Sequence, residues 1–328
     1  MSEKTLELCK DILICDKWEF SKNPIDTEYS DNLQWKCVDI PHDWMIYETR
    51  NLYETSTGWY RRKLDWHKED GIRTAIRFEG VYMDSRVYVN GSLAGEWKYG
   101  YSTFEFDITE LLNEGENEIS VRVDYRSPNS RWYSGAGIYR RVWLRTYPDC
   151  HIASDGIYIS TDICGDVTVT AEVMRPADVP VSELAVKHTV YDGDTAVCSS
   201  QYPCCAYDRS QIPEAIRADG FNYSVNTVTM NVSSPVLWDI DAPHMYTVVT
   251  ELIRNGETQQ RVATKFGIRK AEFTCDKGFF LNDRHVKLHG CCEHHDLGSL
   301  GAAVNKAAIV RKLKKLREMG INSIRTSH

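Results

Sequence analysis

Hydrophobic and polar residues alternate with period two through much of residues 73–145, in short runs bounded by turn residues. One run, 86–90, ends in the Asn90-Gly91 pair, whose two residues tolerate the positive φ of a tight hairpin turn. A later run, 119–124, alternates in the same way. The pattern predicts an antiparallel sheet with one face buried and the other exposed to solvent.

The alternation continues in the next part of the chain. Residues 167–173 place valine or alanine at every second position, and the Asn255-Gly256 pair joins the run 246–253 to the run 260–266. We therefore expect a β-sandwich of immunoglobulin-like size between about residues 149 and 271.

After residue 271 the pattern changes to a strand at 285–289, a helix at 304–319 and a second strand at 321–326, which together form one βαβ unit. The helix carries one apolar stripe, made of Ile309, Leu313 and Leu316. Two parallel strands and one helix cannot bury themselves. We therefore expect the chain to be a fragment of a longer polypeptide, cut inside its third domain.

Composition is that of a globular protein, with 42% hydrophobic and 26% charged residues in 328. No apolar stretch approaches twenty residues, so no membrane span is expected. The net charge of -8 argues against nucleic acid as a partner. No basic segment leads into an apolar run after Met1, so we expect a cytoplasmic protein. The eleven cysteines include no C-x-x-C pair and indicate reduced thiols.

Candidate chemistry gathers at the ends of the two predicted parallel strands, where βα-repeat folds assemble their active sites. The first strand is followed by Cys291-Cys292-Glu293-His294-His295-Asp296, and the second ends in Arg325-Thr326-Ser327-His328. One alternative is that these are ordinary loop histidines. A metal site is a minor alternative, because adjacent cysteines do not easily share one tetrahedral ion.

Two other features have a functional and a structural interpretation. The helix carries a basic run that suggests a nucleic-acid patch, but a charge run opposite an apolar stripe is typical of a solvated helix face. Its members are Lys306, Arg311, Lys312, Lys314, Lys315 and Arg317. The aromatic run 131–140 could stack on sugar rings or pack two β-domains together.

The motifs together resemble glycoside hydrolase family 2, most closely the N-terminal part of a bacterial β-galactosidase. Four stretches carry the resemblance in order along nearly the whole chain. They are Pro41-His42-Asp43-Trp44 with Gly58-Trp59-Tyr60-Arg61, then 78–91, then the aromatic run 131–140, and finally 288–298 with 319–328.

The resemblance implies a mainly β chain: a jelly-roll sugar-binding domain at 1–148, an immunoglobulin-like β-sandwich at 149–271, and the truncated start of a (β/α)₈ barrel at 272–328. It also implies a retaining glycosidase that acts on terminal β-galactosides. Such enzymes use two carboxylates, one as acid/base and one as nucleophile. In this family both lie on later barrel strands, beyond His328, so the chain holds no catalytic residue and is expected to be inactive by itself.

Supporting residues can be carried over from the family. The resemblance implies that Arg325 lies against the nucleophilic carboxylate and that His328 contacts the sugar hydroxyls. One of His294 and His295 does likewise, in a run that Asp296 completes. Arg131 stands where many relatives place an aspartate that reaches into the sugar site, and this difference leaves the sugar preference open.

The runner-up interpretations are a β-glucuronidase of the same family and a stand-alone carbohydrate-binding module. A cation at Arg131 favours an acidic sugar, whereas the His-His-Asp run and Pro-His-Asp-Trp favour a galactosidase. The expected partner is a β-galactoside sugar or oligosaccharide. The resemblance also admits a homo-oligomer and a magnesium or sodium ion near the site, whose ligands the sequence leaves unassigned.

Overall fold

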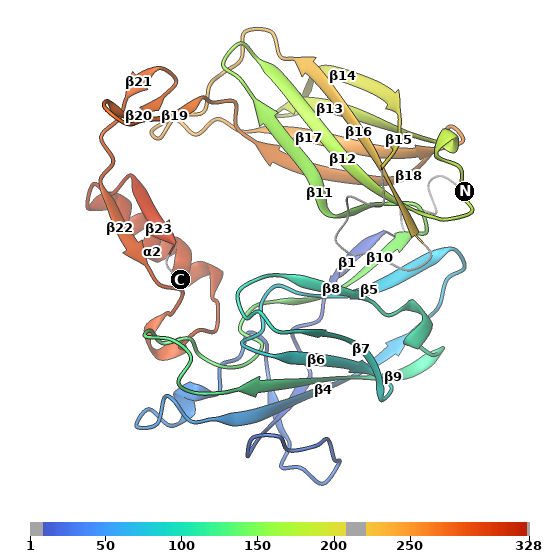
Figure 1. Ribbon diagram of the computed structural model, residues 1–328, viewed down its shortest axis with the longest axis vertical. Coiled ribbons are helices and arrows are strands. Elements are labelled where there is room, and N and C mark those ends of the chain that lie inside the picture. Colours follow the sequence, from blue (N-terminus) through green and yellow to red (C-terminus); the bar gives the residue numbers. More distant parts are fainter. Residues whose placement is uncertain (1–8, 208–220, 327–328) are drawn as a thin grey trace. The chain divides into compact units, whose positions relative to one another are not determined.

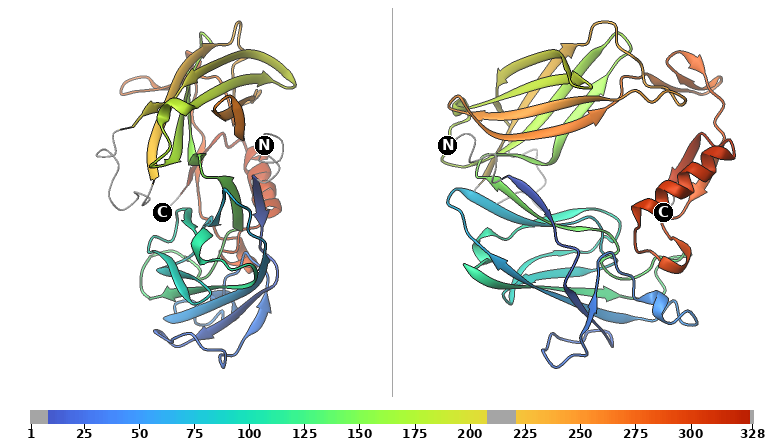
Figure 2. Two further views of the ribbon diagram at one scale, coloured as in Figure 1. Left: turned by 90° about the vertical axis from the view of Figure 1, so that its right-hand side faces the viewer. Right: turned by 180° about the vertical axis from the view of Figure 1, so that it is seen from behind.

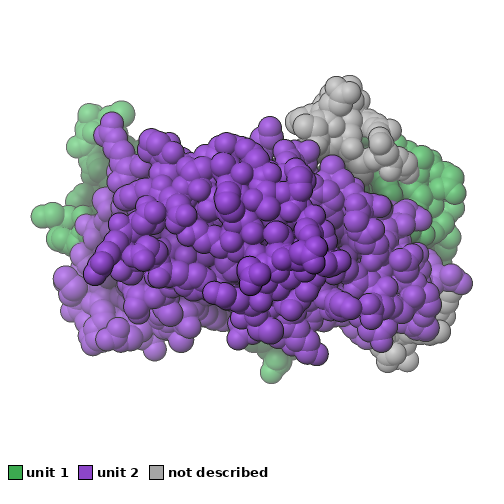
Figure 3. Space-filling view, turned by 90° about the horizontal axis from the view of Figure 1, so that it is seen from below, with its two compact units in different colours: residues 1–9, 147–289 green, residues 10–146, 290–328 purple. Residues whose placement is uncertain are grey.

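The computed structural model describes residues 9–207 and 221–326 and consists mainly of β-strands (Figure 1). The chain divides into two compact units, each discontinuous in sequence. One contains residues 1–9 and 147–289, and the other contains residues 10–146 and 290–328 (Figure 3). The described part of the chain contains no helix with the length and apolar character required to cross a membrane.

The unit of residues 10–146 and 290–328 contains a β-sandwich of two antiparallel sheets around one core. The larger sheet has the strand order β3-β2-β4-β9-β6-β7, and the smaller has the order β1-β10-β5-β8. The core between them includes Trp18, Tyr60, Phe78 and Val121. The strands are β1 (Lys10–Leu13), β2 (Trp18–Asn23), β3 (Lys36–Val38), β4 (Ser56–Trp66), β5 (Ile72–Phe78), β6 (Ser85–Val89), β7 (Ser92–Trp97), β8 (Phe104–Asp107), β9 (Gly115–Tyr125) and β10 (Val142–Pro148).

The predicted hairpin at Asn90-Gly91 is confirmed. It joins β6 to β7, and its residues have φ values of 51° and 79°. The half-exposed strand predicted around residues 119–124 is wrong, because Ser120, Arg122 and Asp124 are buried as well as the apolar residues between them. Arg122 contacts Asp124 at 3.0 Å and Asp26 at 3.1 Å, so the loop between β2 and β3 covers the polar face of β9 with paired charges.

The second unit contains the predicted sandwich. Residues 167–173 bury every second side chain, as the alternation predicts, and the Asn255-Gly256 turn connects two long antiparallel strands. The sheets have the orders β11-β12-β16-β15 and β14-β13-β17-β18. The strands are β11 (His151–Thr161), β12 (Asp166–Pro176), β13 (Leu184–Asp192), β14 (Thr195–Pro203), β15 (Cys205–Ala206), β16 (Phe221–Asn231), β17 (Tyr246–Arg254) and β18 (Glu257–Phe266).

Residues 271–285 form a small antiparallel sheet that the sequence pattern does not indicate. Its strands are β19 (Ala271–Thr274), β20 (Gly278–Leu281) and β21 (Arg284–His285). The short 3₁₀ helices of the described chain include η1 (Met45–Tyr47), η2 (Thr109–Leu111), η3 (Val181–Glu183) and η6 (Gly298–Leu300).

The βαβ unit is confirmed, with shifted bounds. Its parallel strands are β22 (Gly290–Glu293) and β23 (Ser323–Thr326), and α2 (Lys306–Glu318) lies over one face of the pair (Figure 2). The strand predicted at 285–289 is wrong, because parallel pairing begins at Gly290. A Cβ atom there would lie only 2.8 Å from Ser323 Oγ, so the missing side chain lets the strands approach.

Helix α2 starts and stops at the signals its sequence contains. The Asn305 side chain accepts a hydrogen bond from the Ala308 amide at 3.0 Å, and Gly320 follows the helix with φ of 87°. No residue of the helix is buried, and Leu313 of the apolar stripe is 40% exposed. Two strands therefore leave much of the predicted stripe uncovered.

Candidate active site framework

The β-sandwich built from strands β1 to β10 is the predicted jelly roll. The carboxylate of Asp43 connects this jelly roll to the loop that follows β22. Its Oδ1 accepts hydrogen bonds from the amides of Met45 and Ala136, each at 3.0 Å. Its Oδ2 accepts hydrogen bonds from the Tyr133 hydroxyl at 2.5 Å and from the Ala302 amide at 2.8 Å. Three chain segments distant in sequence therefore meet at one buried side chain.

Glycines make this meeting sterically feasible. Gly135 and Gly301 both have positive φ, at 69° and 59°. A Cβ atom on Gly135 would lie 2.7 Å from Asp43 Oδ2, and a Cβ atom on Gly301 would meet the same oxygen. Both positions require glycine for conformation and for space.

The neighbouring His42 belongs to the jelly-roll core. Its Nδ1 lies 2.7 Å from the Tyr60 hydroxyl and its Nε2 lies 2.5 Å from the Tyr47 hydroxyl. Burial lowers the pKa of His42 to about 4, so its imidazole is neutral at pH 7. Trp44 stacks on Phe20 with ring centroids 5.3 Å apart. The Pro-His-Asp-Trp stretch is thus structural framework under the site.

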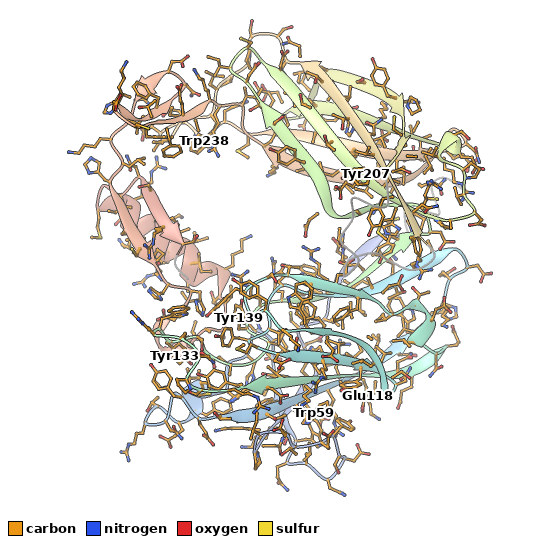
Figure 4. All side chains as sticks on the ribbon, in the orientation of Figure 1. Trp59, Glu118, Tyr133, Tyr139, Tyr207 and Trp238 are labelled. Atoms are coloured by element: carbon orange, nitrogen blue, oxygen red, sulfur yellow. The ribbon has the colours of Figure 1, made fainter. Side chains whose placement is uncertain are left out.

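His295 is held by the aromatic run of the jelly roll. Its Nε2 lies 3.2 Å from the carbonyl oxygen of Ser134, and its ring contacts Tyr101 and Tyr139 with centroids 5.6 Å and 5.9 Å away. Burial lowers the pKa of this histidine. Part of the aromatic run 131–140, in which Figure 4 labels Tyr133 and Tyr139, therefore packs against the loop after β22. The predicted packing between two β-domains and the predicted stacking on sugar both stay predictions.

His294 and Asp296 lie in the same loop, and its main chain is fixed from the helix. Lys312 Nζ donates to the carbonyl oxygen of His294 at 3.1 Å and pairs with the Glu293 carboxylate at 2.6 Å. The Lys312 side chain is 35% exposed, and its ammonium finds carbonyl and carboxylate acceptors at the strand end. The other basic residues of the helix are exposed.

A cavity of about 650 Å³ lies between the jelly roll and this βαβ unit. The jelly roll contributes Tyr99, Tyr101 and Arg140 to its wall, and the βαβ unit contributes Glu293, His294 and His295. The structure thus brings both histidines to one cavity, whose wall is more apolar than polar and also includes Ile309, Val310 and Leu313 of α2.

The other predicted residues lie elsewhere. Arg131 and Arg325 are exposed and do not line this cavity. Arg325 lies opposite Cys292 in the register of the parallel strands. Asp296 is half-buried, and His328 lies outside the described residues.

Asp43 lies in the Pro41-His42-Asp43-Trp44 motif, but the sequence alone predicts no role for its side chain. The available signal was the set of glycines at 135, 137 and 301 in two separate loops, but no spacing rule links them to one carboxylate. As for metals, residues 9–207 and 221–326 contain no group of three or more His, Cys, Asp or Glu arranged to hold an ion. The eleven cysteines all lie within the described residues, and none of them forms a disulfide there.

Comparison with known families decides the classification. Three family models match in order: the sugar binding domain of glycosyl hydrolases family 2 at residues 3–148, the central family 2 domain at 150–269, and the family 2 TIM barrel domain at 274–328. The chain belongs to glycoside hydrolase family 2. It comprises the sugar-binding domain, the immunoglobulin-like domain and the start of the barrel domain of this family.

Similar family 2 proteins include both galactosidases and glucuronidases. A β-galactosidase of Bacteroides ovatus is 41% identical over 313 residues, which cover 92% of this chain and 36% of that protein. A β-glucuronidase of Bacteroides fragilis is 30% identical, over 97% of this chain and 46% of that protein. The chain therefore spans less than half the length of these family 2 relatives.

Solved family 2 structures match the same extent of the chain. A family 2 member from Bacteroides cellulosilyticus superimposes with a TM-score of 0.82 at 28% identity, covering 97% of this chain and 44% of that one. The β-glucuronidase of Bacteroides uniformis gives a TM-score of 0.81 at 27% identity, covering 97% of this chain and 39% of that one.

Proposed function

We propose that this chain is the N-terminal part of a retaining β-galactosidase, which hydrolyses terminal β-galactosides. The proposal rests on the 41% identity to a β-galactosidase over 92% of the chain. The family 2 domain order supports it, with proposed boundaries at 1–148, 149–271 and 272–328. A carbohydrate is accordingly the proposed ligand.

The described βαβ unit supplies the framework of the sugar site. Active sites of such barrels form at the carboxyl ends of the strands. The carboxyl ends of both parallel strands, after Glu293 in β22 and at Thr326 in β23, contribute to the wall of one cavity. This convergence is the structural observation that supports the proposal best.

Within this framework the two adjacent histidines have different roles. His295 is occupied by Ser134 and two tyrosine rings. His294 has its main chain fixed by Lys312, and both histidines contribute to the cavity wall. We therefore propose that His294 makes the sugar contact, with Asp296 in the same loop, and that His328, which lies outside the described residues, contacts the sugar as well.

The two catalytic carboxylates are proposed to come from later barrel strands. A complete (β/α)₈ barrel needs about 250 residues. The barrel family model matches only residues 274–328, and the chain covers 36% of the Bacteroides ovatus relative. Arg325 on the second strand would then hold the nucleophile ionised, because a fixed cation lowers the pKa of a nearby carboxyl group.

A β-glucuronidase is the second candidate. One structural observation favours it: Arg131 is exposed at the start of the aromatic run and is available to an acidic sugar. The test uses the barrel-completed protein, meaning the longer protein that continues past His328 through the whole barrel. Its steady-state kinetics with aryl β-galactosides and aryl β-glucuronides would distinguish a galactosidase from a glucuronidase. A higher kcat/KM for the galactoside supports the proposal, and a higher value for the glucuronide overturns it.

A stand-alone carbohydrate-binding module is the third candidate. Sequencing the gene beyond the codon of His328 tests it. An open reading frame that continues past the codon of His328 and encodes an Asn-Glu pair supports the enzyme. A stop codon directly after His328 supports the module.

A further inference from the structure

We propose that Asp43 is a positioning residue of the sugar site, which holds the loop after β22 in register with the loop that carries Arg131. The inference rests on the proposed function for its catalytic consequence. Asp43 itself is 2% exposed and lies in neither of the loops that it joins.

The hydrogen bonds of Asp43 leave no acceptor for a sugar. An ionised carboxylate has about four acceptor sites. Four donors occupy them here: the amides of Met45, Ala136 and Ala302 and the hydroxyl of Tyr133. Asp43 therefore acts on the site through the segments that it binds.

The bond to Ala302 fixes the barrel loop. Residues 297–301 close a tight turn, in which the Leu297 amide donates to the Gly301 carbonyl at 2.8 Å. The amide of Val304 donates to the Tyr139 carbonyl at 2.9 Å. The candidate sugar contact His294 is therefore three residues from a turn that is attached to the jelly roll at two points.

The bonds to Tyr133 and Ala136 fix the jelly-roll loop. Arg131 precedes this anchored segment by two residues. The Asp43 carboxylate thus determines the spacing between His294 of the barrel loop and Arg131 of the jelly-roll loop. His294 is the proposed sugar contact, and Arg131 is the proposed determinant of sugar preference. A misplacement of about 1 Å in such groups can cost on the order of 100-fold in rate.

The substitution Asp43→Asn tests the role with almost no change in side-chain volume. An amide has one acceptor oxygen and one NH₂ group, so one orientation turns the NH₂ toward the Ala302 amide. The opposite orientation turns it toward the amides of Met45 and Ala136. Either orientation brings an N–H donor against a backbone donor, so the variant loses at least one anchor.

Asp124→Asn provides a matched control. Asp124 is also buried in the jelly roll, where it accepts a hydrogen bond from Thr57 at 2.6 Å and pairs with Arg122 at 3.0 Å. Its partners lie in the sheet and its covering loop, away from residues 131–136 and 294–302. The control therefore removes a buried charge without touching the proposed anchor.

A second variant disturbs the same contact from the barrel side. Gly301→Ala would place a methyl group against Asp43 Oδ2 and would also strain a backbone φ of 59°. Because both variants break one anchor, the double variant Asp43→Asn/Gly301→Ala should lose little more than either single variant.

The experiment measures the barrel-completed enzyme and its four variants in parallel. The readouts are kcat and KM with an aryl β-galactoside, the Tm, and amide exchange of residues 294–304. We expect Asp43→Asn to lower kcat/KM about tenfold or more and to speed exchange in 294–304. Asp124→Asn should lower the Tm. Its kcat/KM and its amide exchange in residues 294–304 should equal those of the wild type.

The outcomes are separable from those of the proposed function. Equal kcat/KM for Asp43→Asn and the wild type, or equal losses for both Asp variants at matched Tm, would overturn the positioning role. Additive losses in the double variant would overturn the shared anchor. If the wild type hydrolyses no β-galactoside or β-glucuronide, the proposed function fails, and unchanged exchange in 294–304 of Asp43→Asn then still overturns the anchor.

Discussion

The imidazole of His295 donates from Nε2 to the carbonyl oxygen of Ser134 over 3.2 Å, which connects the first barrel loop to the aromatic run of the jelly roll. Burial lowers the pKa of His295, so this contact is made by a neutral ring. Both His294 and His295 contribute to the cavity wall. Because the ring of His295 is held by Ser134 and two tyrosines, we propose a packing role for His295 and the sugar contact for His294.

This division predicts different kinetics for two alanine variants of the barrel-completed enzyme. His294→Ala removes a hydrogen bond to the sugar and should lower kcat/KM by about 10- to 100-fold. His295→Ala should mainly lower the Tm and speed amide exchange in residues 294–304. Kinetics and exchange on both variants check the assignment, and a larger kinetic loss in His295→Ala would reverse it.

Arg325→Ala should be the most damaging single change. Without a cation beside it, the nucleophilic carboxylate has a higher pKa and a looser orientation, which costs on the order of 3 kcal/mol in transition-state stabilisation. The measurement is kcat/KM against pH for wild type and variant. Wild-type kinetics in Arg325→Ala would remove the basis for placing the site at these strand ends.

Arg131→Ala should change sugar selectivity more than overall rate. The exposed guanidinium is a donor for hydroxyls or a carboxylate, so its removal should alter the ratio of kcat/KM for β-galactosides and β-glucuronides. Arg126→Ala is the matched control, because Arg126 pairs with Asp26 at 2.8 Å. An unchanged ratio in Arg131→Ala would leave this residue a packing role only.

The stability of the jelly roll should fall as the pH decreases below about 6.5. His42 has a folded pKa of about 4, below the ordinary value of 6.5, so the unfolded chain binds a proton in this range and the native chain does not. Between pH 6.5 and 5 this difference should lower the free energy of unfolding by roughly 1.5 kcal/mol. Denaturant unfolding at both pH values, in wild type and His42→Gln, checks the prediction. An equal pH dependence in the two proteins would contradict it.

The sequence predicted the elements well where a repeating pattern determines them. The Asn-Gly hairpins, the buried side of β12 and the parallel βαβ unit all follow from periodicity and turn chemistry. The failures have one kind of cause. The polar face of β9 is buried by charges from a loop distant in sequence, and the first parallel strand begins where a glycine lets Ser323 approach.

Contacts between residues distant in sequence also limit what can be predicted of the candidate site. The family resemblance indicated the histidine run, but only the three-dimensional contacts distinguish His294 from His295. The role of Asp43 depends on a bond to Ala302, 259 residues away, and no local pattern encodes such a contact. The placement of Arg131 and Arg325 at the sugar stays a prediction.

The central claim is that these residues build the framework of a retaining β-galactosidase whose catalytic carboxylates lie in later barrel strands. The most direct test follows aryl β-galactoside hydrolysis by NMR, with the barrel-completed protein and the purified 328-residue chain side by side. We expect the longer protein to release β-galactose first, before mutarotation, and the 328-residue chain to give no turnover. Turnover by the 328-residue chain, or α-galactose as the first product of the longer protein, would contradict it.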